Sequence, residues 1–150
     1  MRLVIQRVTH ASVSIDGRLH AAIGPGLLVL VGMEQTDTQA DADWLARKTA
    51  QLRIFNDAQG VMNCDITAAG GDALVVSQFT LYASYRKGNR PSWFRAATHD
   101  VAIPLYQYFC DTLGQLIGRP VATGQFGADM QVSLLNDGPV TICMDSKNRE

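Results

Sequence analysis

The chain has 150 residues and is predicted to form a single domain over residues 1–150, a length that buries a core without disulfides or a structural metal. Its composition, 47% hydrophobic and 18% charged, is that of an ordinary globular protein. The net charge of −1 excludes a polycationic nucleic-acid binder, so any contact with nucleic acid must use a local patch or shape.

The first thirty residues are rich in Val, Ile and Leu and predict a meander of strands. Residues 1–15 form extended segments, with apolar and polar side chains alternating toward the end. Asp16-Gly17 supplies a two-residue hairpin turn, and residues 18–23 return as the partner strand. A Gly-Pro-Gly break then precedes an apolar strand over 27–31, a run too short to span a membrane.

Two helices are predicted from capping residues and helical spacing. The first begins with a cap at residues 36–38 and ends near Arg53. The second is capped by Asp100, carries Pro104 in its first turn, where a missing donor costs little, and ends at Gly118.

Strands account for the rest of the chain. One is expected over 73–80, and closing strands over 121–124, 130–135 and 140–144, with a turn at 136–139. Two helices cannot cover both faces of a doubly wound sheet. The pattern therefore predicts an α+β fold with a largely antiparallel, curved or barrel-like sheet and two main helices packed on one side.

The cysteines and histidines show no metal-ligand pattern. Cys64, Cys110 and Cys143 are odd in number and far apart, and no signal peptide is visible, so we expect reduced thiols in a cytoplasmic protein. The three histidines are not at ligand spacing and no phosphate-binding glycine loop opens a helix. We therefore expect no metal, no cofactor and no membrane association.

The strand over 73–80 changes from apolar to polar at its end. Ser77, Gln78 and Thr80 follow Val75-Val76, and a basic turn comes next. Such a strand end suits the floor and rim of a site for a polyanion, although an edge strand with satisfied hydroxyls accounts for the same residues. Neither hydroxyl has a G-x-S-x-G elbow or an identifiable His partner. An enzyme built here would act by positioning and backbone hydrogen bonds.

Two further segments allow more than one interpretation. Basic side chains that alternate with aromatic ones fit contact with RNA phosphates and an exposed base, whereas a solvated loop over packed aromatics is the simpler alternative. The residues are Arg86, Lys87, Arg90 and Arg95 with Tyr82, Tyr85, Trp93 and Phe94. Gly138-Pro139 is either an ordinary turn or a device that presents two backbone carbonyls, which a cis peptide would orient the same way.

Four segments together resemble the D-aminoacyl-tRNA deacylase family: S-Q-F-T-L at 77–81, G-N-R-P-S at 88–92, G-Q-F-G-A-D-M at 124–130 and N-D-G-P-V-T at 136–141. The resemblance covers the whole chain. It implies a homodimer that hydrolyses the ester between a D-amino acid, or glycine, and the 3′ end of tRNA, including glycine loaded on alanine tRNA. It also implies that no metal or other cofactor takes part.

The resemblance further implies roles for particular residues. Ser77, Gln78, Phe79 and Thr80 would form the catalytic wall, with main-chain N–H groups for the oxyanion and Thr80 in a positioning role. Gly138 and Pro139 would form a Gly-cis-Pro motif that reaches into the partner subunit's site, holds the substrate's α-amino group and excludes an L side chain. Arg7 would pin that loop, and Arg86, Lys87 and Arg90 would contact tRNA.

Two other classes of function fit parts of the sequence. An RNA-binding module without catalysis would keep the basic aromatic loop, and a purely structural dimer would use the strand over 73–80 as an interface. Both predict that Gly138→Ala or Pro139→Ala leaves function unchanged. A deacylase instead predicts lost activity or lost chiral discrimination.

Overall fold

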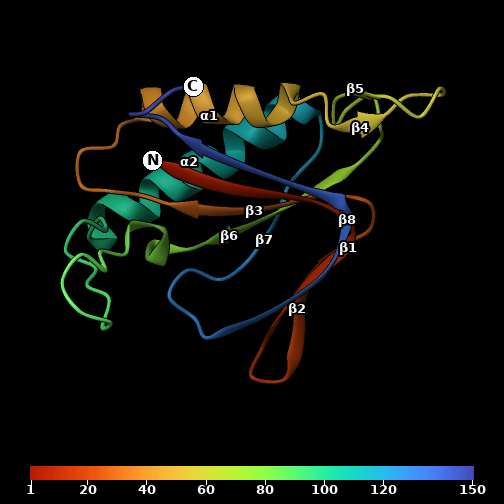
Figure 1. Cartoon of the computed structure of the whole chain (residues 1–150). Coiled ribbons are helices and arrows are strands. Elements are labelled where there is room, and N and C mark those ends of the chain that lie inside the picture. Colours follow the sequence, from red (N-terminus) through yellow and green to blue (C-terminus); the bar gives the residue numbers. More distant parts are fainter.

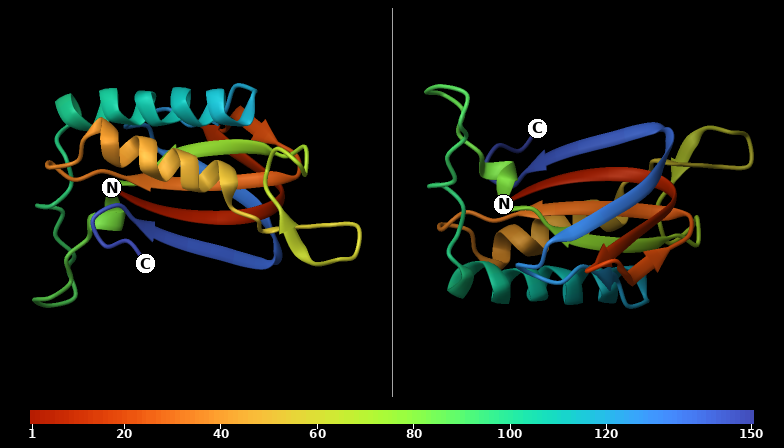
Figure 2. Two further views of the ribbon diagram at one scale, coloured as in Figure 1. Left: turned by 90° about the horizontal axis from the view of Figure 1, so that it is seen from above. Right: turned by 90° about the horizontal axis from the view of Figure 1, so that it is seen from below.

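The computed structural model describes all 150 residues and shows a six-stranded mixed sheet with two helices on one face (Figures 1 and 2). The strands of the main sheet are β1 (Arg2–Ile15), β2 (Arg18–Ile23), β3 (Gly26–Gly32), β6 (Asp72–Ser77), β7 (Ala122–Thr123) and β8 (Met130–Asp145). The helices are α1 (Gln39–Gln51) and α2 (His99–Ile117), with a short 3-10 helix, η1 (Phe79–Tyr82). β4 (Phe55–Asn56) and β5 (Met62–Cys64) form a separate small hairpin.

The first three strands form one long interrupted hairpin, so the predicted meander is wrong. β2 and β3 pair in succession with β1, from Ile15↔Arg18 to Arg2↔Gly32, and β8 pairs with β1 over the same length. A strand has two edges, so β2 and β3 share one edge of β1 and β8 occupies the other. The predicted turn at Asp16-Gly17 is confirmed, since both residues have positive φ.

The chain from 130 to 145 is also one strand, so the turn predicted at 136–139 is wrong. β8 pairs with β1 from Ile15↔Met130 to Arg2↔Asp145, and two register shifts between Gln6 and His10 absorb its extra residues as a bulge. Gly138 and Pro139 lie in this bulge, are exposed and are joined by a cis peptide. The long partner strand carries pairing across the break, which local turn chemistry does not reveal.

Both helices lie on one face because two similar crossovers carry the chain in the same direction across the sheet. β3 pairs parallel with β6 and β6 pairs parallel with β7, with α1 in the first connection and α2 in the second. Parallel crossovers are almost always right-handed, so successive steps the same way place their helices on the same side. The predicted fold class is confirmed, with a parallel portion added to the antiparallel one.

Some boundaries differ from the predicted ones. The strand expected over 73–80 ends at Ser77, where η1 takes over. Helix α2 is capped by Thr98 rather than Asp100, which lies in the first turn. The earlier start puts Pro104 in the second turn, so the Asp100 carbonyl has no i+4 amide donor. The predicted end at Gly118 and the start of α1 after Thr38 are confirmed.

Two apolar clusters hold the layers together. The larger one, of 22 buried residues, fills the space between the helices and the sheet and includes Leu45, Phe109 and Leu113. A cluster of six, including Val8 and Leu74, lies apart from it and packs against Met130 and Val132 of β8. The three cysteines are free. Neither α1 nor α2 has the apolar length that a membrane-spanning helix needs.

Candidate active site

The end of β6 and the start of η1 form one wall of a cavity of about 320 Å³. Gln78 continues the β6 ladder, since its N–H donates to Val31 O at 2.7 Å, and the chain then turns into η1. The cavity is lined by Ser77, Gln78 and Phe79 from this wall, and by Met33, Ala96, Ala97, His99, Ala102, Phe126 and Gly127 from other segments. The polar strand end therefore borders a pocket rather than an ordinary sheet edge.

Hydrogen-bond donors open the 3-10 helix at this wall. The N–H groups of Phe79 and Thr80 are the first two of η1, so they have no acceptor within that helix, and no side chain caps them. The side-chain amide of Gln78 donates to Thr80 Oγ1, which orients that hydroxyl. Apart from His99, the cavity lining carries no ionisable side chain. This wall can therefore bind and polarise a carbonyl oxygen, and it contains no carboxylate or thiol to act as base or nucleophile.

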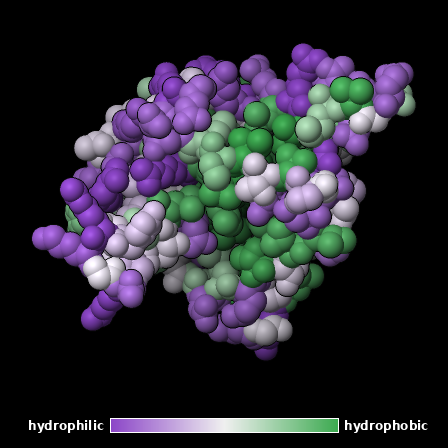
Figure 3. Space-filling view, viewed as in Figure 1, coloured by the Kyte–Doolittle hydropathy of each residue, from purple (hydrophilic) through white to green (hydrophobic).

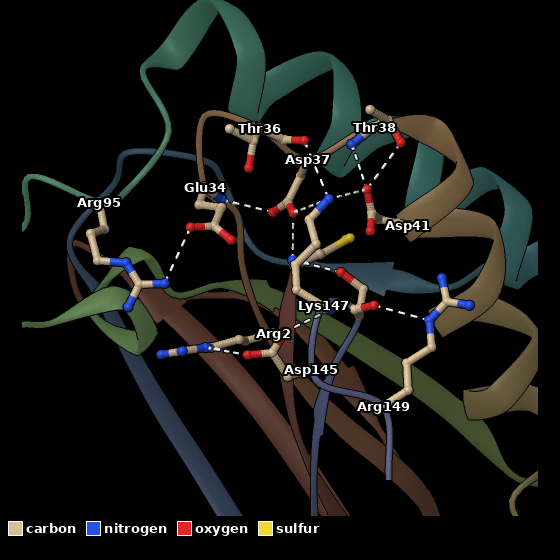
Figure 4. A network of polar contacts seen from close by, with 12 residues as sticks. Arg2, Glu34, Thr36, Asp37, Thr38, Asp41, Arg95, Asp145, Lys147 and Arg149 are labelled. Atoms are coloured by element: carbon tan, nitrogen blue, oxygen red, sulfur yellow. Dashed lines mark hydrogen bonds and ion pairs between the residues drawn. The ribbon is translucent and has the colours of Figure 1, made fainter.

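Arg2 fastens the far end of η1 to the sheet, and Figure 4 shows its ion pair with Asp145. Its Nη1 donates to Leu81 O at 3.0 Å and its Nε bonds Asp145 Oδ2 at 2.8 Å, which raises the pKa of Arg2. The Arg2 guanidinium also lies 4.6 Å from the centre of the Tyr82 ring, and that of Arg95 lies 5.4 Å from it. Tyr82 is buried between them, so it cannot take part in RNA contact as the sequence pattern suggested. Burial raises its pKa.

A second set of ion pairs supports the loop beside the cavity (Figure 4). The Met1 ammonium bonds Asp37 Oδ1 at 2.6 Å, and Asp37 Oδ2 accepts from Glu34 N at 2.8 Å. Lys147 Nζ bonds Asp41 Oδ2 at 3.0 Å. Burial opposes ionisation of Asp41, but its hydrogen bonds with Lys147 and other donors outweigh burial and hold its pKa below the usual value. This loop follows Met33, a residue of the cavity wall.

Gly138 and Pro139 lie beside Arg7, far from the cavity in the same chain. Arg7 Nη1 donates to Ile54 O at 2.6 Å, and Arg7 Nε donates to Asp137 O at 3.2 Å. The bulge of β8 lies opposite Arg7 of β1, and Arg7 pairs with Leu27 of β3. Leu27 in turn pairs with Ala73 of β6, which precedes Ser77 by four residues. Three strand spacings and four residues amount to roughly 15–20 Å. Figure 1 accordingly shows the bend of β8 and η1 at opposite ends of the sheet.

The basic loop begins close to the cavity and extends into solvent. An antiparallel bridge between Ser84 and Ser92 closes it, and Arg86, Lys87 and Arg90 are exposed in it without an ion-pair partner. Ala96 and Ala97, which follow the loop, line the cavity. The segment that follows the loop therefore borders the pocket, whereas the three cations lie on the exposed part of the loop.

Sequence reasoning missed three side chains of the cavity, Met33, His99 and Phe126. His99 is exposed, and its ring lies edge-on to Phe126 with centroids 5.6 Å apart. Phe126 lies within the G-Q-F-G-A-D-M segment, which was its only signal. The three residues come from separate segments, so no spacing rule could have grouped them.

A broad apolar surface lies on another face of the molecule. It includes a groove of about 620 Å³ between α1 and β8, whose apolar lining includes Trp44, Leu52, Ile142 and Met144. β8 pairs only with β1, so its other edge is free, and Leu134 and Leu135 on it are exposed. Figure 3 shows the hydrophobic area across this face.

Comparison with known proteins connects the chain to one family. Residues 4–145 match the family described as D-Tyr-tRNA(Tyr) deacylase. The D-aminoacyl-tRNA deacylases of Phocaeicola vulgatus and Parabacteroides distasonis are 63% and 61% identical over all 150 residues, which is the full length of each chain.

Two solved structures have the same fold. A c-Myc DNA unwinding element binding protein superposes with a TM-score of 0.91 at 40% identity, over 97% of this chain and 98% of its own. A probable eukaryotic D-amino acid tRNA deacylase superposes with a TM-score of 0.81 over 95% of this chain and 97% of its own. Its identity of 17% supports the fold alone.

Proposed function

We propose that each active site is assembled from two copies of this chain, which belongs to the D-Tyr-tRNA(Tyr) deacylase family and hydrolyses D-aminoacyl-tRNA. The observation that carries the proposal is the distance between its two parts. The catalytic wall at Ser77–Thr80 and the exposed Gly138-Pro139 bulge lie at opposite ends of the sheet within one chain. A second copy can supply the bulge that the first copy holds away from its own cavity.

The apolar face supports a homodimer as the functional unit. A free strand edge with exposed leucines is a hazard that proteins normally cover. The groove between α1 and β8 continues this surface and includes Leu81 of η1 and Arg2 of β1, which bonds the Leu81 carbonyl. A second copy that covers this face would therefore also approach the catalytic wall.

The chemistry we assign to the wall is ester hydrolysis by water. Water adds to the ester carbonyl, the N–H groups of Phe79 and Thr80 stabilise the oxyanion, and collapse releases the free D-amino acid and the tRNA hydroxyl. Ser77 and Gln78 shape the wall, and Thr80, held by Gln78, positions the reacting groups. The lining contains no carboxylate, and His99 is its one ionisable side chain; we assign activation of the water to the tRNA's own 2′-hydroxyl.

Chiral selection in this proposal comes from exclusion. The carbonyls of Gly138 and Pro139 from the partner hold the substrate's α-amino group and occupy the place that an L side chain would need. Glycine has no side chain to exclude, so glycyl-tRNA, including glycine loaded on alanine tRNA, is also a substrate. Arg7, whose side chain is 8% exposed, holds the bulge through Asp137.

Binding of tRNA is assigned to the acceptor end. Arg86, Lys87 and Arg90 are exposed in the loop that leads to the cavity, and the chain carries a net charge of only −1. Three phosphate contacts to a single strand predict a weak salt dependence, with a log–log slope of about −2. A much steeper slope would contradict this small footprint. Translation supplies the substrate, so we place the activity in the cytoplasm.

The first experiment measures release of amino acid from D-tyrosyl-, L-tyrosyl- and glycyl-tRNA in the presence of chelator. We expect hydrolysis of the D-tyrosyl and glycyl esters only. Binding without hydrolysis would indicate an RNA-binding module, and hydrolysis of both hands would refute the role of Gly138 and Pro139.

A mixing experiment tests the shared site. Thr80→Val should inactivate the wall and Gly138→Trp should block the pocket that the bulge enters, so each variant alone is inactive. When the two are co-expressed, mixed dimers carry one site with both defects and one intact site, so activity should return to about a quarter of the wild-type value. No recovery in isolated mixed dimers would show that both parts act within one chain.

A further inference from the structure

An exposed aromatic pair lies at the mouth of the cavity. Phe79 and Trp93 are 54% and 40% exposed, and their ring centroids are 5.3 Å apart at an interplanar angle of 78°. Phe79 lines the cavity and Trp93 does not. A flexible ligand that leaves the cavity past Phe79 therefore meets Trp93 next. Large exposed aromatic rings beside a pocket are typical of binding surfaces.

The position of Trp93 is fixed by the backbone around it. The Ser84–Ser92 bridge, with hydrogen bonds of 2.8 and 2.9 Å, ends at the preceding residue. The carbonyl of Trp93 accepts from Ala96 N at 2.9 Å, and Ala97 N donates to Met33 O at 2.9 Å. Trp93 therefore stands on a segment that is hydrogen-bonded on both sides and tied to the cavity wall.

The charge around the pair favours a polyanion. No Asp or Glu occurs between Asp72 and Asp100, whereas Arg86, Lys87, Arg90 and Arg95 all lie in that interval. These four cations leave the rest of the chain with a net charge of −5, since the whole chain carries −1. Arg95 is paired with Glu34, but the other three have no acidic partner. The aromatic pair thus lies in a positive region of an otherwise acidic molecule.

We propose that Phe79 and Trp93 form a stacking platform for the base of the unpaired nucleotide that precedes the terminal nucleotide of the tRNA. This inference rests on the proposed function, because the ester must enter the cavity at the end of a single strand. Once the terminal nucleotide is inside, the preceding base emerges past Phe79 with its phosphates toward the basic loop. Single-stranded bases stack on exposed aromatic rings whatever their sequence, which suits an enzyme that acts on many tRNAs.

The platform predicts a substrate-dependent defect. Trp93→Ala should lower kcat/KM on D-tyrosyl-tRNA by roughly 5- to 150-fold, the range expected for loss of one stacked base. The same variant should hydrolyse the D-tyrosyl ester of the terminal nucleoside alone at the wild-type rate, since that substrate has no preceding base. Trp93→Phe should keep most of the activity on both substrates. Leu19→Ala, which truncates an exposed apolar side chain outside the basic aromatic loop, is the control and should change neither.

The outcomes separate the platform from the site itself. An equal loss on both substrates would overturn the proposal, because Trp93 would then support the cavity and not a base. An unchanged kcat/KM on tRNA would also overturn it. If wild-type protein released no D-tyrosine from D-tyrosyl-tRNA, the proposed function would fail, whatever Trp93 does.

Discussion

Gly138→Ala is the substitution that most directly tests how the bulge works. Gly138 has a φ of +118°, a conformation that L residues rarely adopt, and an added Cβ would lie 2.8 Å from both Arg7 Nη2 and Val140 Cγ2. Backbone strain of this kind costs about 1–3 kcal/mol. The methyl group also pushes on Arg7, whose bonds to Ile54 O and Asp137 O satisfy groups that cost about 1–3 kcal/mol each when left buried and unpaired.

The expected result is a loss of stability together with a loss of chiral discrimination. If the bulge cannot relax, the free energy of unfolding should fall by about 2–5 kcal/mol, as measured by urea denaturation. If it relaxes, the loss is smaller but the carbonyls of residues 138 and 139 move. In either case the ratio of D-tyrosyl- to L-tyrosyl-tRNA hydrolysis should fall.

Gly17→Ala is the matched control. Gly17 also has a positive φ, +72°, but an added Cβ would meet nothing within 4 Å. This variant should lose about 1–2 kcal/mol of stability from the backbone alone and keep the wild-type D-to-L ratio. If Gly138→Ala behaved like Gly17→Ala in both assays, the role of the bulge in discrimination would be refuted.

Three further substitutions test other contacts. Arg2→Gln removes the bond to Leu81 O and the cation above the Tyr82 ring, so the free energy of unfolding should fall by about 1 kcal/mol and kcat should drop. An unchanged kcat would show that η1 holds its position without Arg2. Asp41 has a lower pKa in the folded protein than in the unfolded chain, where it is about 3.9, so its ionised form stabilises the fold above that pH. This stabilisation is lost as the pH falls toward the folded-state pKa, so the stability of the wild type should decline below about pH 4. In acid denaturation, Asp41→Asn should flatten that decline. Tyr106→Phe removes the 2.8 Å bond from its hydroxyl to the buried Val75 carbonyl, which still accepts from Gly124 N, so urea unfolding should show a loss of about 1 kcal/mol.

Features that depend on neighbouring residues were determined by the sequence itself. Asp16-Gly17 makes a hairpin because both residues tolerate positive φ, Thr38 starts a helix with Asp41 as its capping partner, and Gly118 ends one in the left-handed conformation. Each is a matter of a few adjacent groups, so a pattern of residue types is enough. The motifs at Ser77–Thr80 and Gly138-Pro139 were likewise recognisable as written.

Features that depend on distant segments were decided only by the tertiary structure. The chain around 136–139 has the composition of a turn, yet β1 pairs with both sides of it and makes it a bulge within one strand. Met33, His99 and Phe126 share a cavity only because β3, α2 and the segment before β8 converge there. The separation of Ser77 from Gly138 follows from strand register and order. These are set by which apolar faces pack together across the whole chain, a choice that no local stretch of sequence contains.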